Sequence, residues 1–168
     1  EEDSQRRDFT INAMYLPVRE LAKKRNGRLN VIDFQGGKED IHRQRIRFVG
    51  NAAKRIYEDP LRMMRLISLK SKTDFWVDDT ALDAVRKNAA LIKEIPSERI
   101  NMELEKILVS KKPSKSFILM HSVGLLNLIL PELEHCVGVA QHPTYHKFDV
   151  FNHCVRVCDS TPPILALR

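Results

Sequence analysis

The chain has few cysteines, and their spacing gives little support for a metal site or a disulfide framework. Cys136, Cys154 and Cys158 are the three cysteines among 168 residues, and no Cys-x-x-Cys pair occurs. Cys154 and Cys158 are one helical turn apart, with His153 as the adjacent histidine, so a zinc site would need further ligands. We therefore expect free thiols in a reducing compartment.

Long apolar runs are also missing, and this excludes some classes of protein. No run approaches the ~20 residues of a membrane span, and no secretory signal is visible, so we expect a cytoplasmic protein without a membrane partner. Hydrophobic residues still make up 43% of the chain, which is enough for a core. Lysine and arginine number 28 against 22 acidic residues, and this net charge of +6 mildly favours phosphate-bearing partners.

The two ends of the chain suggest a piece of a longer protein. The sequence opens on EEDSQRRDF without a methionine, and it closes on STPPILALR, where an apolar helix begins. We therefore expect a fragment.

The first fifty residues predict mixed structure. Short extended runs at 13–18 and 29–34 are separated by Asn26-Gly27, a strong turn signal, so we expect a hairpin with residues 18–28 as its loop.

The next segment begins with a glycine turn. Gly36-Gly37 ends the second extended run, and KEDIHRQR (38–45) favours a helix because its acids come first and its bases last. RIRFVG (45–50) alternates, which predicts a third extended piece.

Helical spacing of apolar residues dominates after residue 50. The expected helices start near Glu58 with Pro60 in the first turn, and then cover 78–95, 97–111 with Ser97 as N-cap, 113–130 with a possible break at Gly124, and 146–160. The predicted fold class is α+β, with a small β-containing piece joined to an all-helical bundle and a boundary near residue 50.

The cluster EDPLRMMR carries charges at helical spacing. On a helix, Glu58, Arg62 and Arg65 share one face, Asp59 lies on its flank, and the methionines point into the bundle. A solvated charged face with a routine ion pair, worth ~0.3–0.5 kcal/mol, is one interpretation.

The other interpretation of this cluster is recognition of a nucleobase. A carboxylate accepts hydrogen bonds and a guanidinium donates them, so an Asp59–Arg62 pair matches an edge that offers an amino donor beside a ring-nitrogen acceptor. Cytosine and adenine offer that edge, whereas uracil and guanine do not. Arg65 would hold a phosphate or orient the pair.

The cluster RRDFTINAM, near the start of the chain, fits a complementary task. Arg7 is a candidate fork for a phosphate and Asp8 a candidate acceptor for a ribose hydroxyl, and we expect Arg7 to line the same pocket as Arg62. Asn12 would cap or turn the backbone. The alternative is that these residues are surface charges at the start of an element.

Three blocks, RRDFTINAM, VIDFQGGKED and RFVGNAAKRIYEDPLRMMR, resemble in order and spacing the bacterial-type (class II) tRNA nucleotidyltransferase and poly(A) polymerase family. They span residues 6–65, and the helices that follow are similar to the neck and body of that family. The fold implied is the end of a nucleotidyltransferase head followed by an all-helical neck and body. Expected domains are residues 1–50, 51–134 and 135–168, the last being the start of an HD-type domain.

The resemblance implies template-independent addition of CMP or AMP to a tRNA 3′ end, from CTP and ATP, with Mg²⁺ held by an Asp-x-Asp pair. By motif match, Arg7 would contact the triphosphate, Asp8 the sugar, and Asp59 with Arg62 the base. Arg65 would support that pair, with Asn12 and Glu58 as supporting residues.

Two departures from the family pattern limit what this chain can do alone. The glycine-rich motif and the Asp-x-Asp pair lie upstream of the matched blocks, so we expect no catalytic or metal residue here and little activity from this chain. Where the family often carries a further arginine, this sequence has Ser68.

The last part of the chain resembles the opening of an HD-type phosphohydrolase domain. His153 matches the first metal-binding histidine of that pattern, and His146 is seven residues before it, but two histidines make no complete site.

Two other functions remain open: a non-catalytic helical module that holds RNA, and part of an HD-type phosphohydrolase. The sequence does not separate CCA addition from CC, A or poly(A) addition. Basic residues are scattered, as in Lys23-Lys24-Arg25, Lys111-Lys112 and Lys115, and they place no RNA contacts.

Overall fold

The computed structural model of the chain describes residues 1–18, 30–142, 144 and 147–168. Its helices and 3-10 segments are α1 (Glu2–Gln5), η1 (Thr10–Asn12), α3 (Gly37–His42), α4 (Ala52–Glu58), α5 (Arg62–Thr73), α6 (Asp79–Asn88), η2 (Ala89–Glu94), α7 (Ser97–Leu108), α8 (Pro113–Ser122), α9 (Leu126–Ile129), α10 (Pro131–Glu134), α11 (Val150–Ser160) and η3 (Leu165–Leu167). Its strands are β1 (Met14–Tyr15), β2 (Ile32–Asp33), β3 (Arg45–Ile46) and β4 (Trp76–Val77).

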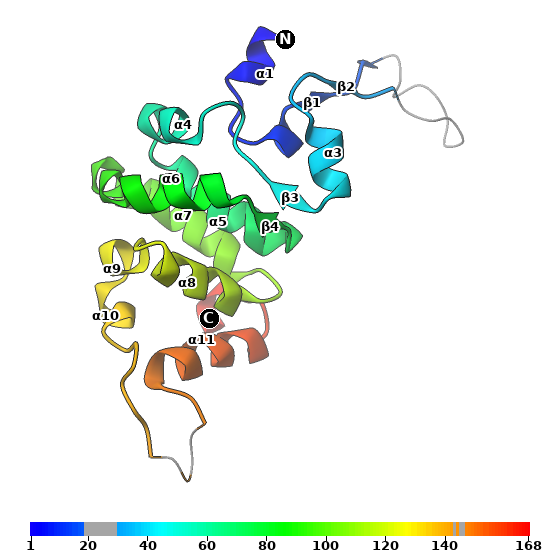
Figure 1. The fold of residues 1–168 in the computed structure, drawn as a ribbon. Coiled ribbons are helices and arrows are strands. Elements are labelled where there is room, and N and C mark those ends of the chain that lie inside the picture. The colour runs from blue at the N-terminus through cyan, green and yellow to red at the C-terminus, as the bar shows by residue number, and fades with distance from the viewer. Residues whose placement is uncertain (19–29, 143, 145–146) are drawn as a thin grey trace.

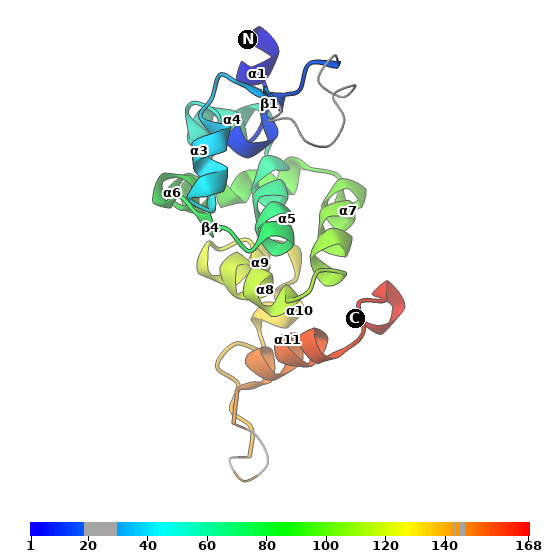
Figure 2. The same ribbon diagram turned by 90° about the vertical axis from the view of Figure 1, so that its right-hand side faces the viewer.

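The elements follow one another along the molecule in nearly the order of the sequence. Strands β1 to β3 and α3 lie at the N-terminal end, α4 to α7 with β4 form the middle, and α8 to α11 form the other end (Figures 1 and 2). This arrangement confirms the predicted α+β class, in which a small β-containing piece precedes a helical bundle.

The predicted hairpin is present. Strands β1 and β2 pair antiparallel, with Met14 opposite Asp33 and Tyr15 opposite Ile32. The expected turn at Asn26-Gly27, like the basic run that precedes it, lies outside the described residues.

The sequence predicted only one strand of the second pair. The alternating run at 45–50 contributes β3, as predicted, but its partner is β4, which lies thirty residues further along the chain and pairs parallel to it. Arg45 is opposite Trp76 and Ile46 opposite Val77, so this pair joins the N-terminal piece to the helical bundle. A two-residue strand between two helices carries no periodic signal that would predict it.

The expected continuous helix through EDPLRMMR is wrong. Helix α4, capped by the Asn51 side chain, ends at Glu58, Asp59 is extended with φ −152°, and α5 begins at Arg62. Pro60 explains the break, because its ring disfavours helical geometry at the preceding residue and it has no N–H to donate. Glu58 and Arg62 therefore belong to different helices.

Three later helices differ from the prediction in detail. The expected helix at 78–95 is α6 followed by the 3-10 segment η2. Ser97 is the first residue of α7, whose N-cap is Pro96. Gly124, with φ +79°, separates α8 from α9, so the suspected break there is confirmed. The last expected helix begins later, at Val150, after an Asp149 cap.

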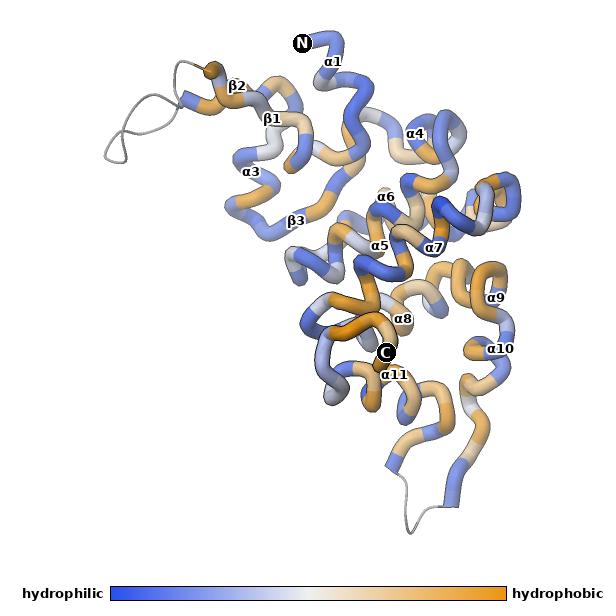
Figure 3. Tube along the Cα trace, turned by 180° about the vertical axis from the view of Figure 1, so that it is seen from behind, coloured by the Kyte–Doolittle hydropathy of each residue, from blue (hydrophilic) through white to orange (hydrophobic). Residues whose placement is uncertain are grey.

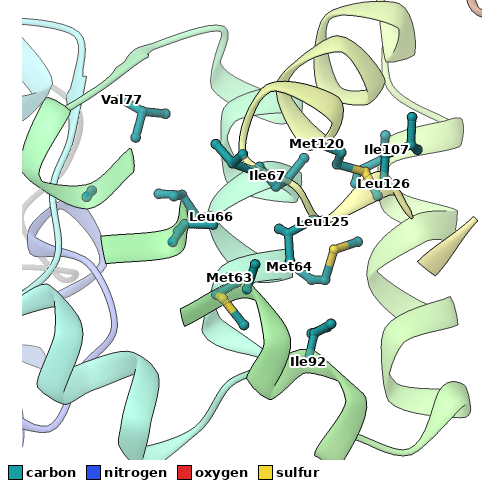
Figure 4. Close-up of a cluster of buried hydrophobic side chains, with 14 of the residues drawn as sticks. Met63, Met64, Leu66, Ile67, Val77, Ile92, Ile107, Met120, Leu125 and Leu126 are labelled. Carbon is teal, nitrogen blue, oxygen red and sulfur yellow. The ribbon is translucent and has the colours of Figure 1, made fainter. Parts of the chain in front are cut away.

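The core lies where α5 packs on α7 and α8. Met63, Met64 and Ile67 are fully buried on α5, as expected, and they belong to one hydrophobic cluster with Ile107 of α7 and Met120 of α8 (Figure 4). Hydrophobic residues recur along these helices between polar ones (Figure 3). Since complete burial of such a side chain contributes about 1.5–3 kcal/mol, this cluster fixes the orientation of α5.

The glycine turn before α3 is organised by Asp33. Its carboxylate accepts hydrogen bonds from the backbone N–H groups of Gln35, Gly37 and Lys38 at 3.1, 3.0 and 2.8 Å. Burial opposes ionisation, but these donors outweigh it and lower the pKa of Asp33. Gly37 also passes close to Thr10, because a Cβ at this position would lie 2.3 Å from the Thr10 carbonyl oxygen.

Replacing Gly37 by alanine is therefore expected to destabilise the chain. The added methyl group meets backbone atoms of Thr10, which cannot move aside as a flexible side chain can, so we expect a loss of about 1–3 kcal/mol. Urea unfolding measures it, with Glu39→Ala in the same helix as the control. Equal midpoints for the two variants would contradict the close approach.

Candidate site at the junction of α4 and α5

Asp8 is the meeting point of two arginines from α5. Its Oδ1 lies 2.7 Å from Arg62 Nε and its Oδ2 lies 2.6 Å from Arg65 Nε. The backbone around Asp8 is fixed, because its carbonyl accepts the N–H of Val49 and the next residue, Phe9, forms a bridge with Phe48. The site thus joins the N-terminal segment to the first turn of α5.

Arg62 is held by further acceptors. Its Nη1 lies 2.9 Å from Glu58 Oε2 and 2.7 Å from the Arg55 carbonyl oxygen, and its Nη2 lies 3.3 Å from the Arg6 carbonyl oxygen. A guanidinium has five N–H groups, so one remains uncommitted after these bonds and the bond to Asp8. Arg62 lines a cavity of about 510 Å³ together with Arg55 and Glu58.

The same contacts shift the pKa values of Arg62 and Glu58. Burial opposes the charge on Arg62, but its hydrogen bonds to Glu58 and Asp8 outweigh that cost and raise the pKa of the guanidinium. The hydrogen bond from Arg62 lowers the pKa of Glu58, and Arg55 at 2.9 Å adds to this. Both groups are therefore charged at neutral pH.

Asp59 has different partners from Arg62. Its Oδ1 accepts the backbone N–H of Leu61 at 3.2 Å, and its Oδ2 lies 3.3 Å from Arg99 Nη2 on α7. The structure therefore brings an acid and a guanidinium together, but the guanidinium is that of Arg99. We did not identify Arg99 from the sequence, because a charged residue in the first turn of an amphipathic helix is usually solvated.

In the described residues Arg7 pairs with Asp3 rather than with a side chain of α5. The two side chains are 2.8 Å apart, Tyr15 donates its hydroxyl to the same Asp3 oxygen at 2.7 Å, and the Arg7 guanidinium lies 5.9 Å from the Tyr15 ring centroid. The hydrogen bonds from Tyr15 and then from Arg7 lower the pKa of Asp3. In this structure Asp8 is the member of the triplet that joins the arginines of α5.

The departure at Ser68 has a structural consequence. The Ser68 hydroxyl donates to Glu103 Oε2 of α7, and Glu103, which is 5% exposed, also pairs with Lys106 at 2.7 Å. Beside them lies a cavity of about 640 Å³, whose lining also includes Asn12 and Arg65. A larger side chain at position 68 would extend toward this space.

The described residues do not offer a metal site. Nowhere in the described ranges do three His, Cys, Asp or Glu side chains converge as metal ligands. The part of the chain that the structure describes therefore does not fit a resident Mg²⁺ ion. His146 lies outside the described residues. None of the described helices is both long and apolar enough to span a membrane.

Two family models match separate parts of the chain. Residues 1–47 match the poly A polymerase head domain, and residues 74–136 match the "probable RNA and SrmB- binding site of polymerase A". The segment between them contains Asp59, Arg62 and Arg65.

Several proteins that resemble the chain are CCA-adding enzymes. A CCA-adding enzyme of Limosilactobacillus reuteri (strain DSM 20016) is 46% identical over 112 residues, which is 67% of this chain and 26% of that enzyme. The crystal structure of the Bacillus stearothermophilus CCA-adding enzyme in complex with CTP superposes with a TM-score of 0.67 at 38% identity, over 74% of this chain and 29% of that one.

A third similar structure contains RNA. It is a tRNA nucleotidyltransferase complexed with a primer tRNA and an incoming ATP analog, with a TM-score of 0.65 at 26% identity, and the match covers 85% of this chain and 38% of that one. The chain thus spans about a quarter to two fifths of the length of these proteins.

Proposed function

The chain belongs to the tRNA nucleotidyltransferase and poly(A) polymerase family that includes the CCA-adding enzymes, and from this premise we propose that it selects the incoming nucleotide for addition to a tRNA 3′ end. The observation that carries the proposal is the convergence of Asp8, Glu58, Arg62 and Arg65 where α4 meets α5. In the proposed reaction, carried out in the cytoplasm by the enzyme that contains this chain, CMP or AMP is transferred from CTP or ATP.

We assign base recognition to Asp59 and Arg62. In the free chain each side chain has another partner, and the Asp59–Arg99 contact at 3.3 Å is long and partly exposed. Such a pair contributes little, so a base edge that offers an amino group to Asp59 can displace Arg99. Arg62 retains one N–H for the ring nitrogen. Cytosine and adenine satisfy both groups. Uracil and guanine in the same position place a carbonyl oxygen against Asp59 and a ring N–H against Arg62, so neither group finds its partner.

The remaining roles follow from charge and position. Asp8 accepts a ribose hydroxyl, Arg7 and Arg65 hold phosphate oxygens, and Glu58 and Asn12 support the site. When the nucleotide binds, Asp8 loses its contact with one arginine and accepts a hydrogen bond from the ribose hydroxyl instead. Mg²⁺ would be held by carboxylates outside this chain, and its chemistry is stabilisation of the charge on the transferred phosphoryl group.

We propose the same division of the chain into domains as the sequence indicates. Residues 1–50 form the end of a head domain, residues 51–134 form a neck and body, and residues 135–168 begin an HD-type domain. The pairing of β3 with β4 supports a rigid connection across the first boundary.

A hybrid enzyme tests nucleotide selection. This chain replaces the matching part of the Limosilactobacillus reuteri CCA-adding enzyme, and the hybrid is supplied with tRNA that ends before CCA and with one nucleotide at a time. We expect incorporation from CTP and ATP, and at least about 30-fold less from UTP and GTP, because a buried polar group without a partner costs about 1–3 kcal/mol and two groups lack one. Free use of UTP by the hybrid, but not by its parent, would contradict the proposed base recognition.

A non-catalytic module that holds RNA is the second candidate. A groove lined by lysines beside α5 favours it. A hybrid that binds tRNA normally but incorporates no nucleotide would support this alternative.

A further inference from the structure

A small cavity lies where the end of α5 meets the start of α8, and lysines dominate its lining. Its volume is about 240 Å³, and we call it the lysine pocket after Lys70, Lys72, Lys111, Lys112 and Lys115. Among the described residues that line it, Asp74 is the one carboxylate, and it lies 2.6 Å from Lys115 Nζ. The net charge of the pocket is therefore strongly positive, and a pocket of one charge sign concentrates ions of the other sign.

A buried hydroxyl in the lysine pocket also lacks a partner. Ser116 of α8 is fully buried, and within the part of the chain that the structure describes its Oγ makes no hydrogen bond. A buried polar group without a partner is unfavourable, so a ligand oxygen that accepted a hydrogen bond from Ser116 would remove this cost. The cavity is smaller than the ~300–1,000 Å³ of a typical drug-sized site, which favours a compact anion.

Lys70 differs from the other four lysines in its surroundings. It is half-buried, whereas the other four are exposed. Its Nζ lies 3.0 Å from the Phe75 carbonyl oxygen, and this contact holds the amine in place. Burial lowers the pKa of Lys70, Asp74 opposes this effect, and the charge of Lys115 adds to it. A lowered pKa leaves more of the amine uncharged, and the uncharged amine is the nucleophile.

We propose that Lys70 is a modification site, acylated on Nζ by an acyl phosphate that the lysine pocket binds. An acyl phosphate is the mixed anhydride of a carboxylic acid and phosphoric acid. One small molecule thus supplies both the anion that the pocket attracts and a carbonyl carbon that an amine attacks. A lysine that is desolvated beside another cationic group is an activated nucleophile of a general kind.

The acylation step balances without a further reagent. The lone pair of Lys70 Nζ attacks the carbonyl carbon, the bond from that carbon to the bridging oxygen breaks, and its electron pair leaves with inorganic phosphate. The nitrogen releases a proton to the departing phosphate, and an amide remains on the side chain.

Other groups of the pocket can assist this step. Among the described residues, the side chains of Lys72 and Lys111 form neither a hydrogen bond nor an ion pair, so they are available to the phosphate that leaves. The Ser116 hydroxyl can donate to the carbonyl oxygen as that oxygen gains negative charge.

Site-resolved labelling of the 168-residue chain tests the proposal. The chain is incubated with acetyl phosphate near neutral pH, and peptide mass spectrometry follows acetylation of each lysine over time. Lys87 and Lys93 are internal controls, because both are exposed and neither lines the pocket. We expect Lys70 to be acetylated at least about 10-fold faster than either control at low salt, the lower end of the enrichment that a charged pocket gives. This advantage should fall as salt rises, because salt screens the attraction.

A pair of variants and an uncharged reagent separate attraction from reactivity. Combining Lys111→Ala with Lys112→Ala should slow acetylation of Lys70 by about 3-fold or more, because two of the five cations are lost. Combining Lys38→Ala with Lys93→Ala removes the same charge at exposed positions elsewhere and should leave the rate at Lys70 unchanged. With N-hydroxysuccinimidyl acetate, which carries no charge, the advantage of Lys70 should be smaller than with acetyl phosphate. Circular dichroism checks that the variants are folded.

Several results would overturn the proposal. Acetylation of Lys70 no faster than that of Lys87 would remove the site. Equal rates at Lys70 and Lys72 would make the pocket a site for free anions without a preferred nucleophile. An equal advantage of Lys70 with the uncharged reagent, or equal effects of the two double variants, would leave no role for binding of the acyl phosphate. None of these measurements involves CTP or ATP, so the proposal stands or falls separately from nucleotide selection.

Discussion

Replacing Arg62 by alanine in the hybrid enzyme is expected to reduce incorporation of CMP and AMP by about 100-fold or more. The substitution removes four hydrogen bonds at once, and Asp8 and Glu58 lose the cation that they share. Loss of one partner of a buried, hydrogen-bonded charge pair costs about 2–5 kcal/mol, and about 2.7 kcal/mol corresponds to 100-fold. Single-turnover incorporation with CTP and with ATP measures it.

Controls separate recognition from folding. Arg62→Lys keeps the charge but lacks the planar fork, so we expect it to recover little activity while its thermal midpoint stays near that of the parent. Arg86→Ala removes an exposed arginine of α6 that pairs with Asp83, and it should leave activity unchanged. Full activity of Arg62→Ala, or an equal loss in Arg86→Ala, would refute the assignment of Arg62.

The sequence predicted the elements whose pattern is visible within their own residues. The hairpin, α3 and the amphipathic helices were expected because alternation, acid-to-base order and apolar stripes are local properties. The break at Asp59 was within reach, since Pro60 restricts the residue before it, but the charge pattern across it was regular enough to suggest a single helix. The parallel partner of β3 is non-local and was missed.

The sequence also predicted the candidate site only in part, because the partners of its residues come from distant segments. Residue type and spacing selected Asp8, Arg62 and Arg65, and the structure brings these three together. The partners of Asp59 and Arg7 could not be predicted, because Arg99 approaches from α7 and Asp3 from the first turn of the chain. The lysines that line the cavities beside α5 likewise come from segments whose basic residues looked scattered in the sequence.

Replacing Asp40 by alanine is expected to lower the free energy of unfolding by about 3 kcal/mol, the lower end of the range for an unpaired buried charge. Asp40 is fully buried, accepts the Thr10 hydroxyl at 2.5 Å, and lies 2.7 Å from Arg45 Nε and 3.0 Å from Arg47 Nη2. The lower end applies because Arg45 and Arg47 are partly exposed and can be rehydrated. Urea unfolding measures the loss, and Asp83→Ala, in an exposed pair, should cost about 0.5 kcal/mol or less.

The pH dependence gives this prediction a second test. Burial opposes ionisation of Asp40, but hydrogen bonds from Thr10, Arg45 and Arg47 outweigh it and lower the pKa below the ordinary value of 3.8. A lowered pKa stabilises the folded chain above the ordinary value, and this stability is lost as the pH falls through the folded value. The advantage of wild type over Asp40→Asn at neutral pH should therefore persist to about pH 4 and shrink below it. An advantage that is constant down to the lowest pH at which both proteins fold would mean that Asp40 acts by shape and hydrogen bonding rather than by charge.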